Sequence, residues 1–313
     1  MRKIVVLDGY AANPGDLSWD EIASLGDLSV FDRTAPEMVL NRCKNAEIVI
    51  TNKTPLNQET LQKLPELKMI SVLATGYNVV DIKAANRQNI VVSNVPGYST
   101  QSVAQLVFAY ILEFCHHVQR HTDAVKTGAW SQCKDFCFWN YPLVELEGKT
   151  LGIVGYGTIG KAVEKIALAF GMNVLKCASK PREGCTLLED VLKNSDFITL
   201  HCPLTEQTNK LINRTTLELM KPGAFLINTS RGAVVDDEAL AEAIQQGRIA
   251  GAAMDVLSNV EPPRQDNPLL YVENCFITPH LAWATLEARK RLLKVTYENI
   301  LAFLSGNPIN TVN

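Results

Sequence analysis

The stretch Leu151-Gly152-Ile153-Val154-Gly155-Tyr156-Gly157-Thr158-Ile159-Gly160 decides the fold of this chain. Its apolar first half predicts a buried parallel strand, and apolar residues then recur at helical spacing as far as Gly171. A strand, a turn with the pattern G-x-G-x-x-G and a helix form the context of a dinucleotide site. The glycines allow a tight turn, close approach of a pyrophosphate and helix–strand packing. We therefore expect Gly155, Gly157 and Gly160 to hold a dinucleotide, with Thr158 and Ile159 at its pyrophosphate.

Strand and helix patterns alternate on both sides of this glycine turn, which lies mid-chain in 313 residues. Before it, we predict helices such as Asn57–Lys63 and Asp81–Gln88 between the strands Lys3–Leu7, Leu28–Phe31, Glu47–Ile50 and Met69–Val72. From the turn onward we predict the strands Leu151–Val154, Asn173–Cys177, Phe197–Leu200, Ala224–Asn228, Gly251–Asp255 and Phe276–Thr278. The first series indicates a parallel α/β unit, and the second a doubly wound sheet.

Two long helical patterns suggest how these units are joined. Val103–Val118 is apolar and could link them, while Leu286–Leu304 could return to pack on the first unit. We therefore predict a dinucleotide-binding domain at residues 99–285, inserted into a smaller substrate-binding domain made of residues 1–98 and 286–313.

The second strand of the dinucleotide unit ends without the acid that usually holds the ribose. NAD-binding units place Asp or Glu there, about 20 residues after the glycines, to bond the 2′-hydroxyl. Here the strand continues into Ala178-Ser179-Lys180-Pro181-Arg182. Ser179, Lys180 and Arg182 suit a 2′-phosphate, which favours NADP over NAD as the cofactor. The alternative is a basic loop that contacts nothing.

Composition excludes several classes of protein. A hydrophobic content of 47% and a charged content of 20% are ordinary for a soluble enzyme. The net charge of −3 does not favour nucleic-acid binding, and no apolar run is long enough to predict a membrane span. The eight cysteines are scattered, as expected of reduced thiols in the cytoplasm. His116, His117 and His121 lack metal-site spacing, and we expect them to be solvated.

Three residues with catalytic chemistry follow neighbouring strands of the second sheet. Arg231 follows Ala224–Asn228, Glu261 lies in the loop after Gly251–Asp255, and His280 follows the last strand. Because ligands bind beyond the carboxyl ends of parallel strands, we expect all three at one edge, with the glycine turn. These types fit oxidation of a 2-hydroxy acid: a permanent cation for the carboxylate, a base for the hydroxyl proton, and a carboxylate that orients the base.

At this point the chain resembles the D-isomer-specific 2-hydroxyacid dehydrogenases over nearly its whole length. The matching stretches are Gly155–Gly160, His201-Cys202-Pro203-Leu204-Thr205, Asn228-Thr229-Ser230-Arg231-Gly232, Asp255-Val256, Glu261-Pro262 and Thr278-Pro279-His280. The resemblance implies a Rossmann-type domain inserted into a flavodoxin-like substrate domain. It also implies that Arg231 binds substrate and that Glu261 and His280 move the proton. From the spacing of its histidines and cysteines, no metal site is expected.

The resemblance carries further positions over. It implies that the amides of Thr75 and Gly76 bind the substrate carboxylate, although a plain glycine turn would give the same pattern. It implies that Asp255 bonds the nicotinamide amide, with a strand-end cap as the alternative. The remaining cofactor contacts expected on this basis are His201, Cys202, Pro203, Thr229, Ser230, Arg231, His280 and Ala282.

Trp283 narrows the substrate, because His280-Leu281-Ala282-Trp283-Ala284 is similar to glycerate dehydrogenases, also called hydroxypyruvate reductases. An indole beside His280 would wall a small pocket, so we expect hydroxypyruvate or glyoxylate to be reduced to D-glycerate or glycolate. Trp283 could equally be a core or interface aromatic. Formate dehydrogenases have glutamine in place of the glutamate, which argues against them here, whereas phosphite dehydrogenases keep all three catalytic residues.

Another class of function stays open, and so does the assembly state. Corepressor-like scaffolds related to this family sense a dinucleotide and bind protein partners, but they typically carry a disordered tail that is not expected after Asn313. Members are usually dimeric through the cofactor domain. The segment Trp130–Pro142 holds five aromatics (Trp130, Phe136, Phe138, Trp139 and Tyr141), which would suit a second subunit or pack within the chain.

Overall fold

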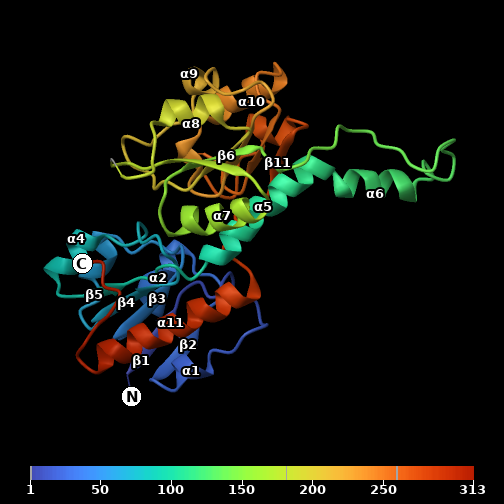
Figure 1. Ribbon diagram of the computed structural model, residues 1–313. Coiled ribbons are helices and arrows are strands. Elements are labelled where there is room, and N and C mark those ends of the chain that lie inside the picture. Colours follow the sequence, from blue (N-terminus) through green and yellow to red (C-terminus); the bar gives the residue numbers. More distant parts are fainter. Residues whose placement is uncertain (1, 181, 259) are drawn as a thin grey trace. The chain divides into compact units, whose positions relative to one another are not determined.

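The computed structural model describes residues 2–180, 182–258 and 260–313 (Figure 1). The chain divides into two compact units, residues 1–99 with 284–313 and residues 100–283. We refer to them as the first unit and the second unit. Pro181, which belongs to the predicted phosphate-binding loop, lies outside the described residues.

The first unit is built on a five-stranded parallel sheet in the order β2-β1-β3-β4-β5. This is the flavodoxin-like order. Its strands are β1 (Lys3–Val6), β2 (Asp27–Val30), β3 (Ile48–Thr51), β4 (Met69–Val72) and β5 (Val91–Ser93). Its α-helices are α1 (Asp20–Ala23), α2 (Val39–Arg42), α3 (Gln58–Gln62), α4 (Ile82–Arg87) and α11 (Leu286–Leu304).

The core of this unit follows from strands that are apolar on both faces. Every residue of β3 and β4 is buried, as expected for parallel strands covered by helices on each side. The predicted helix at the chain's end is present as α11, and it contacts β4. The short strand β5 was not predicted, because three residues give too little pattern to distinguish a strand from a loop.

The second unit carries a six-stranded parallel sheet in the order β11-β10-β9-β8-β6-β7. All six predicted strands are present, with small differences at their ends. They are β6 (Thr150–Val154), β7 (Asn173–Cys177), β8 (Phe197–Leu200), β9 (Phe225–Asn228), β10 (Gly251–Met254) and β11 (Cys275–Ile277).

Helices cover both faces of this sheet, which makes the unit doubly wound. One face packs beneath α5 (Thr100–His116) and α7 (Thr158–Ala169), which lie side by side in Figure 1. The other packs beneath α8 (Leu188–Asn194), α9 (Arg214–Leu217) and α10 (Asp237–Gln245). The predicted fold class is confirmed: an α/β protein with a Rossmann-type sheet in a chain whose two ends form the other sheet.

The long helix predicted at Val103–Val118 is present as α5, which ends at His116, and a second helix that was not predicted, α6 (Val118–Lys126), follows it. His117 separates the two helices with a left-handed backbone, φ 48°. The expectation that His117 is solvated is wrong, because its ring is buried against Tyr141, with ring centroids 4.7 Å apart. Beyond His117, α6 extends away from the sheet of the second unit (Figure 1). Among the residues described, none of the helices combines the length and apolar character of a membrane span.

Candidate active site

The glycine turn after β6 is shaped by two close approaches and one open face. Gly155 has φ +98°, and a Cβ there would lie 2.4 Å from the backbone nitrogen of Cys202. A Cβ on Gly160 would lie 2.7 Å from the carbonyl oxygen of Gly155. At Gly157, in contrast, a Cβ would meet nothing within 4 Å. The fold itself therefore needs the outer two glycines, whereas the middle one leaves room for a ligand.

This turn fits the phosphates of a dinucleotide. Gly157 is the N-cap of α7 and makes no side-chain cap, so the first amides of the helix face outward beside the open space. Two shielded polar atoms at the same sheet edge, His201 Nδ1 after β8 and Thr229 Oγ1 after β9, have no hydrogen-bond partner among the described residues. Since such atoms are costly to leave unpaired, the donors and acceptors present suit a polar ligand lying along this edge.

The other predicted cofactor contacts differ in their burial and in their hydrogen bonds. Cys202 is buried in the core cluster that also contains residues of α8 and α10, its backbone nitrogen lies close to Gly155, and Pro203 is exposed. Ser230 donates its amide and hydroxyl to Asn228 Oδ1. Ala282 is buried, and its amide is bonded to Asp255 Oδ2 at 2.9 Å.

The loop after β7, where the ribose is expected, is basic. Ser179, Lys180 and Arg182 are exposed after β7. Arg182 Nη1 donates to the carbonyl oxygen of Tyr156 at 3.1 Å, which ties the loop back to the glycine turn.

Burial controls the ionisation of His201. Its Nε2 lies 3.0 Å from Thr199 Oγ1, and burial lowers the pKa of His201 to about 3. The imidazole is therefore neutral near pH 7, and one of its two nitrogens acts as an acceptor.

Arg231 is placed by the buried side chain at the end of β9. Asn228 Nδ2 donates to the carbonyl oxygen of Arg231 at 2.9 Å, while Asn228 Oδ1 accepts from Ser230. Gly232 must be glycine, because a Cβ would lie 1.7 Å from the carbonyl oxygen of Leu257. The loop is thus fixed on both sides of Arg231, whose side chain remains exposed. Its Nη1 is bonded to the neighbouring carbonyl of Ser230 at 2.7 Å.

His280 and Glu261 form a hydrogen-bonded pair. Nδ1 of His280 lies 2.6 Å from Oε2 of Glu261, and their side chains are 27% and 37% exposed. With Nδ1 committed to the carboxylate, Nε2 is the nitrogen left to exchange a proton with a substrate. A carboxylate on one nitrogen stabilises the protonated ring, which is what a reversible acid–base group requires.

Asp255, just after β10, holds the loop that carries His280. Its carboxylate accepts from the amides of Leu281 and Ala282, both at 2.9 Å, and from Thr278 Oγ1 at 2.5 Å. Its backbone carbonyl accepts from the amide of His280, whose φ is +53°. Burial raises the pKa of Asp255, while the bonds from Thr278, Ala282 and Leu281 act in the opposite direction. Its expected contact with the nicotinamide stays a prediction.

Not every predicted substrate contact belongs to the second unit. Thr75 and Gly76 follow β4 in the first unit, where Thr75 Oγ1 donates to the carbonyl of Val95 at 2.9 Å. Trp283 is the last residue of the second unit, and its side chain is partly buried. Their roles toward substrate stay predictions. Within the described part of the chain, no three or more His, Cys, Asp or Glu side chains are grouped so as to hold a metal.

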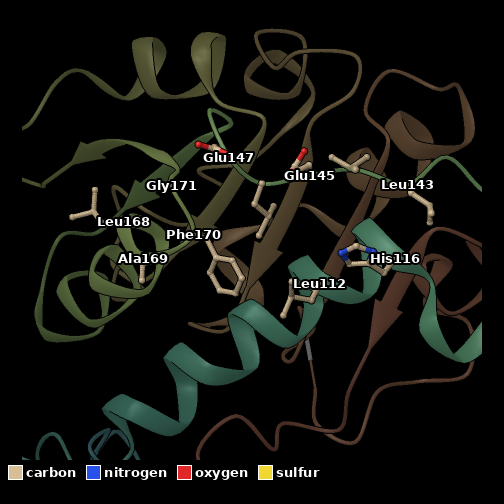
Figure 2. A pocket seen from close by; sticks show the side chains of 11 residues that line it. Leu112, His116, Leu143, Glu145, Glu147, Leu168, Ala169, Phe170 and Gly171 are labelled. Carbon is tan, nitrogen blue, oxygen red and sulfur yellow. The ribbon is translucent and has the colours of Figure 1, made fainter.

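A large hollow in the second unit lies apart from these groups. It has a volume of about 810 Å³ and is lined by α5, the end of α7 and residues 143–147. Figure 2 shows Leu112, Phe170 and Leu143 around it, with Glu145 and Glu147 on the irregular segment above. None of the candidate catalytic residues Arg231, Glu261 and His280 lines it.

Sequence reasoning assigned no role to the residues that hold the loops of Arg231 and His280. Asn228 and Thr278 lie in the stretches that match the family, but their hydrogen bonds could not be read from the sequence. Tyr110, whose hydroxyl is bonded to that of Thr278, gave no signal, because it lies in an apolar helix pattern.

Similarity to known proteins agrees with this geometry. A family model described as "D-isomer specific 2-hydroxyacid dehydrogenase, NAD binding domain" matches residues 108–282. The chain belongs to this family. A hydroxypyruvate reductase of Blautia hydrogenotrophica is 47% identical over 321 residues, 99% of each chain. A glycerate dehydrogenase of Methylorubrum extorquens is 42% identical over 314 residues, again 99% of each.

A solved structure shares the fold over its full length. An acyclic imino acid reductase, determined with NADPH and D-Arg, matches with a TM-score of 0.87 at 32% identity, over 99% of this chain and 100% of that one. As a member of the D-2-hydroxyacid dehydrogenase family, the protein is an oxidoreductase that acts on a CH–OH group with a nicotinamide dinucleotide as acceptor.

Proposed function

We propose that this D-2-hydroxyacid dehydrogenase reduces hydroxypyruvate or glyoxylate to D-glycerate or glycolate, and that it prefers NADPH. The observation that carries the chemistry is the Glu261–His280 pair, 2.6 Å apart, at the sheet edge where Arg231 and the glycine turn also lie. The substrate class is supported by Trp283, which follows His280 by three positions in the sequence, and by similarity to a hydroxypyruvate reductase and a glycerate dehydrogenase.

In this proposal each residue has one task. Arg231, a permanent and exposed cation, binds the substrate carboxylate. His280 begins protonated and gives its Nε2 proton to the carbonyl oxygen as C2 is reduced, while Glu261 stabilises the imidazolium. The nicotinamide, when bound, supplies the hydride. In the reverse direction His280 removes the hydroxyl proton.

NADP is favoured by charge at the ribose end. The place of the usual acid is taken by Ala178, and Ser179, Lys180 and Arg182 follow it. A carboxylate there would repel a 2′-phosphate and bond a free 2′-hydroxyl, whereas these side chains do the reverse. The related imino acid reductase was solved with NADPH, which fits the same expectation.

One substrate panel tests the proposal. Hydroxypyruvate, glyoxylate, pyruvate, a branched keto acid and phosphite would each be assayed with NADPH or NADH at equal concentration. We expect the highest kcat/KM for the two- and three-carbon keto acids with NADPH. Strong turnover of the branched acid with none of hydroxypyruvate would overturn the substrate proposal. No turnover of any substrate would favour a dinucleotide-sensing scaffold.

Variants test the proton relay separately. His280→Ala should lower kcat by about 10²–10⁴-fold, and Glu261→Gln by less, because the ring would remain but lose its anionic partner. His116→Ala is a matched control, since His116 is an exposed histidine of the same unit. If His280→Ala were as active as that control, the relay would be wrong.

We also propose a homodimer in the cytoplasm. Trp130, Phe136 and Trp139 in the arm after α6 are 53%, 89% and 64% exposed, which is unusual for aromatics of a monomer. Phe138 and Tyr141 instead face His121 and His117 within the chain. All eight cysteines are free thiols, as expected in a reducing compartment. Sedimentation of the wild type against Trp139→Ser would test the dimer.

A further inference from the structure

Tyr156, the residue between the first two glycines of the turn, is held by two neighbouring elements. Its hydroxyl donates to Glu164 Oε2 on α7, and Glu164 Oε1 accepts from Lys176 Nζ of β7 at 2.5 Å. Burial opposes ionisation of Glu164, but the bonds from Lys176 and Tyr156 outweigh it and lower the pKa. The tyrosine ring is therefore fixed beside the glycine turn by a charged pair.

Two cations lie against this ring. Lys176 Nζ is 4.6 Å from the ring centroid, and the guanidinium carbon of Arg182 is 5.5 Å from it. Arg182 also donates Nη1 to the carbonyl oxygen of Tyr156 at 3.1 Å. Tyr156 thus contacts Arg182 both through its π face and through its backbone.

The two cations differ in what they have left to bind. Lys176 is paired with Glu164, and their side chains are only 22% and 17% exposed. Arg182 has no carboxylate partner among the described residues, and only one of its five N–H donors is used by Tyr156. Arg182 is therefore the cation that can still bind an anion.

We propose that Tyr156 is a positioning residue for cofactor selection: its ring and carbonyl hold the Arg182 guanidinium for the phosphate on the adenosine 2′-oxygen. This rests on the proposed preference for NADP. The glycine turn fixes the pyrophosphate, and the loop after β7 reaches the ribose, so a residue of the turn that grips the loop sets the spacing between the two phosphate sites. A guanidinium that is already oriented binds phosphate with less loss of side-chain freedom.

Calorimetric titration with adenosine fragments tests this without turnover. The probes are 2′,5′-ADP, which carries the 2′-phosphate, and 5′-AMP, which lacks it. Tyr156→Leu should weaken 2′,5′-ADP about tenfold, the size of one cation–π contact, and leave 5′-AMP within about twofold. Tyr156→Phe keeps the ring and the carbonyl and should stay within about threefold for both. Arg182→Ala should weaken 2′,5′-ADP by more than about tenfold.

The outcomes separate this inference from the proposed function. Equal losses for both probes in Tyr156→Leu would show a merely structural role and overturn the inference. An unchanged Tyr156→Leu beside a weakened Arg182→Ala would overturn it while the preference for NADP stands. An unchanged Arg182→Ala would overturn the preference itself. Should Tyr156→Leu fail to fold, Tyr156→Met fills a similar volume without a π face and carries the same expectation.

Discussion

Each of the two parallel sheets reverses its strand order next to its first strand, but the loops at the two reversal points are built differently. In the first unit the reversal lies between β1 and β3, and in the second between β6 and β8. After β1, the Asp8 carboxylate accepts from the amides of Asn52, Lys53 and Thr54 at 2.7, 2.5 and 2.8 Å. After β6, glycines leave the amides of α7 facing open space.

This contrast explains how one layout serves two purposes. Amides gathered beyond the carboxyl ends of parallel strands attract an anion wherever the order reverses. In the first unit the chain supplies that anion itself, which fixes the loop after β3. In the second unit the described residues place no carboxylate beside the amides of α7, so a dinucleotide phosphate can bind there. A carboxylate of the same kind, Asp255, follows β10, three strands away from β6, where it fixes the loop that carries His280.

The largest effects are expected from replacing Gly155 and Gly157, the first and the middle glycine of the turn. Gly155→Ala forces a Cβ to within 2.4 Å of the Cys202 backbone at φ +98°, so we expect it to lower the free energy of unfolding by at least about 3 kcal/mol. Gly157→Ala should unfold like the wild type yet bind NADPH at least about tenfold more weakly, because its Cβ enters the ligand space. Denaturant unfolding and fluorescence titration measure the two effects. Normal NADPH binding by Gly157→Ala would contradict this account.

The second largest effect is expected from removing the Asp8 carboxylate. Asp8→Ala leaves three amides without their acceptor, and we expect a loss of about 2–3 kcal/mol confined to the first unit. Hydrogen exchange of peptides from each unit would locate the loss. Asp8→Asn is the control, since it keeps one acceptor oxygen and should lose less. Faster exchange in the second unit alone would refute the assignment.

A smaller loss of stability is expected from weakening the hydrogen bonds around Asp255, the carboxylate that holds the His280 loop. Because Thr278 gives its only hydroxyl proton to Asp255, Tyr110 must donate to Thr278. Tyr110→Phe removes that donor, so we expect about 1.5 kcal/mol less stability and a lower kcat with little change in KM. Phe108→Leu serves as a packing control on the same helix. Unchanged kcat would mean that the bond does not position His280.

The smallest effect should appear in the pH dependence. Burial lowers the pKa of His201 from 6.5 to about 3. Below pH 6.5, His201 is therefore protonated in the unfolded chain but stays neutral in the folded chain. Stability is therefore full above pH 6.5 and falls as the pH drops toward 3, by about 1 kcal/mol at pH 5.5. His201→Gln should flatten this slope in thermal scans between pH 7 and 5.5. An equal slope in both proteins would exclude His201 as its source.

The elements that could be predicted were those with strong local patterns. The glycine turn, the six strands of the second sheet and α11 follow from apolar periodicity and cap residues, which depend on neighbours in sequence. Helix α6 could not be predicted, since its sequence is mostly polar and none of its residues is buried. Likewise, the backbone amides that donate to Asp8 and Asp255 could not be predicted from the sequence. These amides lie 26 or more positions away from the carboxylates, and only the folded chain brings them together.

The division of labour within the chain has an evolutionary consequence. Arg231, Glu261, His280 and the glycine turn all belong to one continuous stretch, residues 100–283, whereas Thr75 and Gly76 belong to the other unit. On the proposed function, the proton relay and the cofactor site are therefore encoded by one unbroken stretch of the chain, whereas the loop after β4 is encoded by a separate segment. Selection on that loop can act without altering the sequence of the stretch that carries the proposed chemistry.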